Sequence, residues 1–358
     1  MINILGNGKL ARWILAAAVI LAAAFWLGTS WASTYYAEQG RTALNSGSFG
    51  EAKTLLERAL FFNSRNAVAH AGLARAILGQ QFPERWPNFP DADFKEAIKH
   101  YEKSFALGLK EKNLPLYQQA IESAGQAYWA LKQYDKAVEK YLEKIRVDPM
   151  RSFWARFLVA YDYFNRSNKP LETLDVLLST PDLASDALQE NKLVEIYTTI
   201  ARLYYYFEDF ENTEKYANLA IENAGPENKT VSIQLAHVLR AYSAARSGDF
   251  TLAEKEISEA DKRADSPGIH ACRLAQVSYL GGDYSKAIRI AAAVKNTKST
   301  SLYSICLRTM ADSFMAQKNI PEARKYMEAY LSLTDALEPK NIFIVRDRER
   351  FKKELQNL

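Results

Sequence analysis

A helical-hairpin pattern recurs along this chain, and it restricts the fold more than any other feature. Its most complete copy runs from residue 118 to residue 149, with small residues at Gly125 and Ala137 and an aromatic residue at Tyr134. This spacing predicts two short antiparallel helices with a turn at 132–134. Pro149 ends the second helix, because proline cannot donate a backbone hydrogen bond. We expect Gly125 and Ala137 to face each other where the two helices approach most closely.

A small residue in the second helix of each hairpin marks the copies of this pattern. Successive markers are 34 to 45 residues apart, and they are Ala52, Ala97, Ala137, Thr173, Thr213, Ala253, Ala287 and Ala323. The pattern resembles the tetratricopeptide repeat, a helical hairpin of about 34 residues. The resemblance implies an all-α fold, a right-handed superhelical solenoid of about eight hairpins over residues 33–334. Because the hairpins fill this range, no separate catalytic domain is expected.

An uncharged, strongly apolar run begins the chain. No residue from Trp13 to Ala37 is charged, and about 20 apolar residues suffice to cross a bilayer as a helix. We therefore predict a transmembrane helix at 13–32 that contacts the lipid bilayer, after a cytoplasmic stub at 1–12. Lys9 and Arg12 precede the run, so the positive-inside bias places the N-terminus inside and the repeats outside the cytoplasm.

Three other interpretations of this run stay open. Ser30-Trp31-Ala32 has the small-x-small pattern of a signal-peptidase site, so residues 1–32 could be a cleaved signal peptide, which would also export the repeats. A buried soluble helix fits the length and the flanking tryptophans less well. An array facing the cytoplasm is the fourth arrangement, and a reporter fused at Leu358 would distinguish it.

Composition and motifs argue against several classes of function. The net charge is only +4 and basic residues alternate with acidic ones, unlike the basic stripe of a nucleic-acid-binding protein, so no nucleic acid is expected as a partner. The sequence has no HExxH, GxSxG, P-loop or CxxC motif. We therefore predict no catalytic residue, no cofactor and no metal site, and we expect the four histidines to be structural.

Cys272 and Cys306, the two cysteines, are one repeat period apart, which places them on neighbouring first helices. A disulfide between them requires Cα atoms within about 7 Å and an oxidising compartment. Their positions within the repeat differ by two, which directs them to somewhat different faces. The alternative is that both are small buried apolar residues.

In the family that the pattern resembles, the first helix of each hairpin lines a concave groove that binds a partner. Carried onto this chain, the groove includes Arg75, Glu122, Gln126, Trp129, Arg166, Arg202, Tyr205, Tyr206, Tyr242, Arg246, Gln276, Tyr279 and Arg308. Tyrosine and arginine dominate this set, and both residue types are common in binding hot spots. The tyrosines could equally fill gaps between neighbouring hairpins.

Two segments depart from the repeat. An insertion at 79–94 contains Phe82, Trp86 and Phe89 among prolines, and it either folds back on its own hairpin or forms a lip that contacts a partner or the membrane. Residues 335–358 predict a helix that caps the solenoid, with a basic helix on a membrane surface as the alternative.

These patterns predict a membrane-anchored scaffold or assembly protein. It would lie in the cytoplasmic membrane and grip a protein partner, a membrane or envelope complex, in its groove on the extracytoplasmic side. The alternative function is recognition of cell-wall glycan or peptide, for which Trp129 and the groove tyrosines would serve as stacking platforms.

Overall fold

A computed structural model describes residues 5–79, 91–179, 190–225, 230–262, 269–294, 300–337 and 341–358 of the chain. In these ranges the chain forms α-helices and one short 3-10 helix, without a strand. The helices separate into two compact units, residues 1–155 and 156–358, which are described in turn. The all-α prediction is therefore confirmed.

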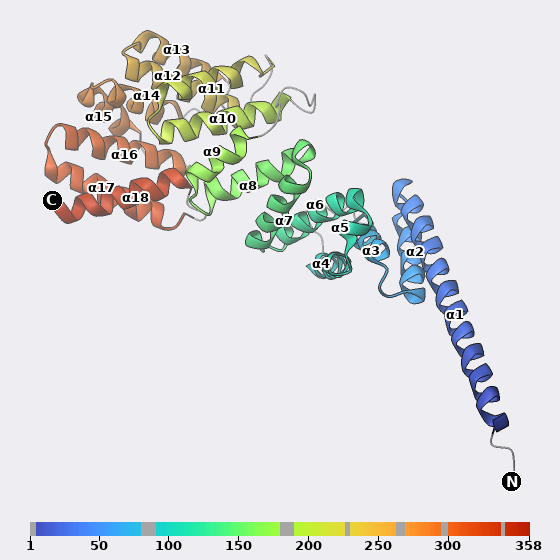
Figure 1. The fold of residues 1–358 in the computed structure, drawn as a ribbon. Coiled ribbons are helices and arrows are strands. Elements are labelled where there is room, and N and C mark those ends of the chain that lie inside the picture. Colours follow the sequence, from blue (N-terminus) through green and yellow to red (C-terminus); the bar gives the residue numbers. More distant parts are fainter. Residues whose placement is uncertain are drawn as a thin grey trace. The chain divides into compact units, whose positions relative to one another are not determined.

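The first unit consists of hairpins packed side by side (Figure 1). Its elements are α1 (Leu5–Asn45), α2 (Phe49–Phe62), α3 (Ala67–Gly79), α4 (Asp91–Ala106), α5 (Leu109–Lys112), α6 (Leu114–Ala130), α7 (Tyr134–Val147) and η1 (Pro149–Arg151). Helices α1 and α2, α3 and α4, and α6 and α7 form three hairpins, which are the first three predicted from the markers.

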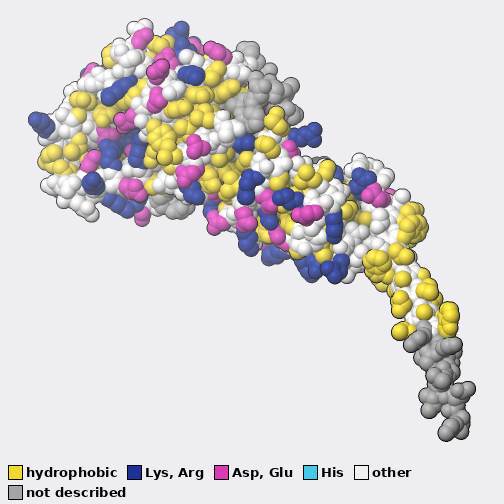
Figure 2. Space-filling view, viewed as in Figure 1, with side chains coloured by type: hydrophobic (Ala, Val, Ile, Leu, Met, Phe, Trp, Pro, Cys, Tyr) yellow, Lys and Arg dark blue, Asp and Glu magenta, His cyan; other side chains and the backbone are white. Residues whose placement is uncertain are grey.

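Helix α1 joins the apolar run to the first hairpin without a break. Residues 13–28 of this helix are exposed, with Trp13 at 75% of full exposure, and Trp31 is 71% exposed, whereas Ser33 is completely buried. By length and composition, Trp13–Asn45 could cross a membrane. Figure 2 shows the apolar side chains of this helix in yellow. The sequence contains no proline between the two parts, so nothing interrupts the helix.

Gly125 lies at a close approach within the third hairpin. A Cβ atom added to it would lie 2.7 Å from the Tyr141 ring. Tyr141 lies one helical turn after Ala137, and its ring is buried at 1% exposure. The missing side chain of Gly125 therefore makes room for this large ring.

The described residues of the second unit form five hairpins and a final helix. Its elements are α8 (Phe153–Asn165, which begins just before the unit boundary), α9 (Pro170–Leu178), α10 (Glu190–Tyr206), α11 (Phe210–Glu222), α12 (Val231–Ser247), α13 (Phe250–Lys262), α14 (Ile269–Leu280), α15 (Tyr284–Ala293), α16 (Thr300–Ala316), α17 (Ile320–Asp335) and α18 (Ile342–Asn357). With the first unit this makes the eight predicted hairpins among the described residues.

Local sequence explains the turns of these hairpins. Gly248 and Gly282 adopt positive φ angles of 89° and 82°, which glycine reaches without steric cost. The aspartates that follow them cap the next helices, since Asp249 accepts a hydrogen bond from the Leu252 amide at 2.9 Å and Asp283 caps α15 in the same way. The sequences Gly248-Asp249-Phe250 and Gly282-Asp283-Tyr284 therefore each form a turn and a helix cap.

A disulfide joins α14 to α16. Cys272 and Cys306 are bonded with their Cα atoms 4.8 Å apart, and both side chains are fully buried. The difference of two repeat positions does not separate them, because neighbouring first helices pack closely at this level. The bond adds a covalent link between the last two hairpins.

Candidate partner-binding face

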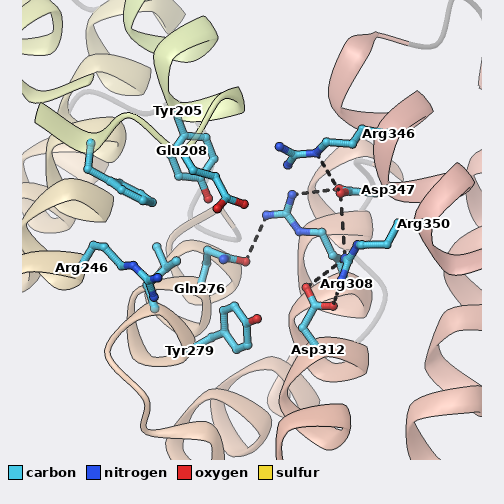
Figure 3. A pocket seen from close by; sticks show the side chains of 12 residues that line it. Tyr205, Glu208, Arg246, Gln276, Tyr279, Arg308, Asp312, Arg346, Asp347 and Arg350 are labelled. Carbon is cyan, nitrogen blue, oxygen red and sulfur yellow. Dashed lines mark hydrogen bonds and ion pairs between the residues drawn. The ribbon is translucent and has the colours of Figure 1, made fainter. Parts of the chain in front are cut away.

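Helix α18 lies at the end of the array, and it also lies against the first helices of hairpins in the second unit. We call the side that it contacts the inner face, defined by residues of α10, α12, α14 and α16 that touch α18 or line the cavities beside it. These residues are Arg202, Tyr205, Tyr206, Tyr242, Gln276, Tyr279, Arg308 and Asp312. Figure 3 shows several of them opposite Arg346, Asp347 and Arg350 of α18.

Two ion pairs hold α18 on the inner face. Arg308 donates to Asp347 at 3.0 Å, and Arg350 donates to both oxygens of Asp312 at 2.7 and 3.2 Å. Asp347 and Asp312 are buried. Buried charges of this kind are strongly destabilising when one partner is removed, so the pairs lock the position of α18.

Aromatic contacts fix the beginning of α18. The Phe343 ring lies 5.6 Å from Tyr206, 6.2 Å from Tyr205 and 5.9 Å from Phe164 of α8, measured between ring centroids. Arg346 covers the Tyr206 ring at 4.7 Å and donates to the Tyr206 carbonyl oxygen at 2.8 Å. The helix therefore connects the last hairpin of this unit to its first two.

At the other side, α18 packs on α17 as a capping helix would. Arg348 donates to the Leu331 carbonyl and the Thr334 hydroxyl, and it pairs with Asp335 at 2.8 Å. Phe351 is fully buried and stands edge-on to Tyr330. The C-terminal helix thus shields the end of the array and also covers part of the predicted groove.

The first cavity beside α18 has a volume of about 290 Å³ and is strongly charged. Arg246, Arg308, Arg346, Arg350, Glu208, Asp312 and Asp347 line it, together with Tyr205, Phe210, Gln276, Tyr279 and Leu280. Most of these charges are paired with each other. Arg246 is exposed and stacks over Phe210 at 5.7 Å, so it is the cation of this cavity that is most accessible to a partner.

The second cavity has a volume of about 360 Å³ and mainly apolar walls. It is lined by Val231, Leu235, Val238, Leu239, Ile305, Ile344, Phe343, Tyr205, Tyr242, Tyr330, Ser304, Asn341, Arg202, Arg273, Arg308 and Asp347. Burial raises the pKa of Tyr242 above its ordinary range, so this phenol stays protonated and neutral.

The structure brings together seven groove residues predicted in the second unit. Arg202, Tyr205, Tyr242, Arg246, Gln276, Tyr279 and Arg308 line one or both cavities. Tyr206 joins them through its contacts with α18. Gln276 is buried and accepts hydrogen bonds from Arg308 and Thr309, so it orients the arginine rather than a ligand.

Arg166 does not join this set. Its guanidinium pairs with buried Asp162 one turn earlier in α8, at 3.1 Å. Asp162 also accepts a hydrogen bond from Ser167 at 2.6 Å. Arg166 therefore takes part in the polar contacts that end α8.

The four predicted residues of the first unit differ in accessibility. Trp129 packs edge-on against Tyr134 and near Tyr141, with ring centroids at 5.0 and 6.4 Å. Glu122 lies 3.7 Å from buried Lys144, and burial raises the pKa of Glu122 although Lys144 opposes this. Arg75 is half-buried on α3, and Gln126 is exposed on α6. Gln126 is thus the most accessible predicted groove residue of this unit, and the packing of Trp129 gives no support to a glycan-stacking platform.

Sequence reasoning missed the importance of Asp347, Arg350 and Arg273. The sequence shows the charges of α18 as an alternating run, and nothing local indicates which of them face the inner surface. The apolar positions Phe343 and Phe351 were the available signal, since they predict a helix with one buried side. Phe82, Trp86 and Phe89 of the insertion lie outside the described residues.

No group of three or more metal-ligating side chains occurs among the described residues. The histidines that the structure describes have protein partners. His70 lies 2.8 Å from His100 between their Nδ1 atoms, and His237 Nδ1 lies 2.7 Å from a carboxylate oxygen of Glu256.

Comparisons with known proteins bear on the fold alone. No protein-family model and no curated protein matches the chain. Among solved structures it is similar to PilF of Pseudomonas aeruginosa, with 17% identity over 72% of this chain and 98% of that one and a TM-score of 0.42. It is also similar to the quorum sensor NprR of B. thuringiensis, with 14% identity over 93% and 100% and a TM-score of 0.47.

A third similar structure is PilW, described as a widely conserved type IV pilus biogenesis factor, with 15% identity over 63% of this chain and 91% of that one and a TM-score of 0.39. The described helices themselves carry the assignment of fold. The eight antiparallel hairpins of the described residues make this chain an all-α array of tetratricopeptide-type repeats.

Proposed function

We propose that this protein is a membrane-anchored scaffold whose repeats hold a protein partner outside the cytoplasm. One observation carries the proposal: α1 is a single helix whose exposed apolar part continues directly into the first hairpin. An exposed apolar surface of this length is unfavourable in water and favourable in lipid. A rigid connection would hold the repeats at a constant height above the bilayer.

Two features support the extracytoplasmic side. Lys9 and Arg12 precede the apolar run, which favours an N-terminus inside the cytoplasm. The bond between Cys272 and Cys306 suits an oxidising compartment, since disulfides rarely persist in the cytosol. Both features point to the same side.

Two surfaces of the repeats are proposed for the partner. In the first unit it is the side that carries Gln126, and in the second it is the exposed rim of the charged cavity around Arg246. Anchoring raises the effective concentration of membrane partners. The role is that of an adaptor, without a chemical step.

The anchor and the sidedness can be tested on the full-length protein. Alkaline extraction of membranes should leave the chain in the pellet, and a protease added outside the cytoplasmic membrane should digest the repeats but not a tag placed before residue 13. Release by alkali would contradict the anchor. Protection of the repeats in sealed spheroplasts, with digestion only after lysis, would contradict the proposed side.

A further inference from the structure

Arginines outnumber carboxylates among the described residues that line the second cavity. It lies inside the second unit, between the inner face and the beginning of α18. Among the described residues, three arginines line it, at positions 202, 273 and 308, and one carboxylate, that of Asp347. Asp347 is already paired with Arg308, so it does not neutralise the guanidinium groups of Arg202 and Arg273.

Arg202 lies between two aromatic rings. Its guanidinium carbon is 4.3 Å from the Phe164 ring centroid and 5.7 Å from that of Phe343. No ion pair or hydrogen bond joins this side chain to another residue in the described parts of the chain. Burial lowers the pKa of Arg202 to about 10, so the residue stays charged at neutral pH in an environment that disfavours its charge.

Arg273 is buried at 9% exposure and likewise has no ion-pair or hydrogen-bond partner among the described residues. The negative charge of Asp261 raises the pKa of Arg273, but burial outweighs it and lowers the pKa overall. A buried guanidinium has five N–H donors that water or a ligand must satisfy. The side chain therefore faces the cavity with its donors available.

The rest of the lining defines what kind of anion would fit. Leu235, Val238 and Ile305 are apolar, and the Asn341 side chain is used to cap α18. A planar carboxylate matches the planar donors of arginine, and the aliphatic lining suits an apolar group attached to that carboxylate. Val231 is 72% exposed and lines the cavity, so its rim is open to solvent.

We propose that this cavity is a binding site for an organic anion that consists of one carboxylate attached to an apolar group. The guanidinium groups of Arg273 and Arg202 bind the carboxylate, and the aliphatic side chains of α12 and α16 contact the apolar group. A volume of about 360 Å³ falls within the range of small-ligand sites. A free organic acid and the C-terminus of a short apolar peptide share this chemistry.

The test is a binding titration on the full-length protein in detergent, with phenylbutyrate as the organic acid and phenylbutanol as its uncharged counterpart. Acetyl-leucyl-leucine and its C-terminal amide form the peptide pair. Binding of either acid with no binding of its uncharged partner supports the site, and the acid that binds more tightly identifies the source. Equal binding of the acid and its uncharged partner in both pairs, or no binding at all, overturns it.

Three variants locate the site. Arg273→Met and Arg202→Met should each weaken binding of the acid by at least about tenfold, the effect expected for loss of one charge-assisted contact. Arg289→Met removes an exposed arginine on α15 that lines neither cavity, and it should leave binding unchanged. The melting temperature without ligand should not fall in Arg273→Met, because the variant removes an uncompensated buried charge.

Unchanged affinity in both Arg202→Met and Arg273→Met would overturn the proposal, as would equal losses in all three variants. If one of the two substitutions prevents folding, the affinity of the other variant for the acid still tests the proposal. The cavity lies wholly within the second unit, so the result is independent of whether α1 spans a membrane or a protein partner binds the repeats.

Discussion

The buried ion pair between Arg308 and Asp347 provides the most quantitative prediction. Asp347 is 3% exposed and the Arg308 side chain is 12% exposed. Asp347→Asn keeps the shape of the side chain but removes its charge, so buried Arg308 loses its ion-pair partner. Loss of one partner from a buried pair costs about 3–5 kcal/mol. Arg308 retains its hydrogen bond to Gln276, so we expect the lower end, about 3 kcal/mol.

Hydrogen exchange measured by mass spectrometry would detect this change in the docking of α18. A cost of about 3 kcal/mol raises the open population roughly 150-fold, so the amides of Ile342–Asn357 should exchange faster by about that factor. The midpoint of urea unfolding of the second unit should move to a lower urea concentration.

Two controls accompany the measurement. Glu349 is exposed on the same helix, and Glu349→Gln should change the free energy of unfolding by less than about 0.5 kcal/mol. The double variant Arg308→Gln with Asp347→Asn should recover part of the loss, because no unpaired charge remains buried. A cost below about 1 kcal/mol for Asp347→Asn would refute the proposed locking of α18.

Three further predictions concern stability. Reducing the disulfide between α14 and α16 opens a loop of 34 residues and should lower stability by about 3–4 kcal/mol, measured by urea unfolding with and without reductant; no change would contradict its structural role. Burial lowers the pKa of both His70 and His100, so the unfolded chain binds more protons and the first unit should lose stability below about pH 6.5. His100→Asn should reduce that dependence in a melting series from neutral pH to about pH 5, and an identical profile would exclude the pair as its source. Gly125→Val would force the Tyr141 ring aside and should cost about 1–3 kcal/mol in thermal unfolding, whereas an unchanged melting temperature would show that the ring moves freely.

Local patterns predicted the helices and turns well. The Gly-Asp-aromatic sequences form capped turns, because a glycine turn and an aspartate cap each depend on a few neighbouring residues. Tertiary contacts were harder to predict. Gly125 faces Tyr141 because of how two helices are rotated about their axes, and residue size alone does not determine that rotation.

In the candidate site, too, the repeat pattern predicted more than could be predicted of the tertiary contacts. The tyrosines and arginines of the second unit gather on one face, as the repeat positions predicted. The occupation of that face by α18 depends on pairs such as Arg346 with Tyr206, which are 140 residues apart. No periodic pattern identifies such a pair. Likewise, Arg202 and Arg273 are distinguished by the absence of an ion-pair or hydrogen-bond partner among the described residues, and this property is not visible in a sequence.

Site-specific photo-crosslinking in intact membranes tests the central claim most directly. Gln126 on α6 and Glu139 on α7 are both exposed and belong to the same hairpin, but only Gln126 lies on the side of the first unit that is proposed to bind the partner. A photoreactive residue at position 126 should yield one discrete adduct with a membrane or envelope protein, and the same residue at position 139 should yield none. The same adducts at both positions, or none at position 126, would contradict a scaffold that binds its partner through this face.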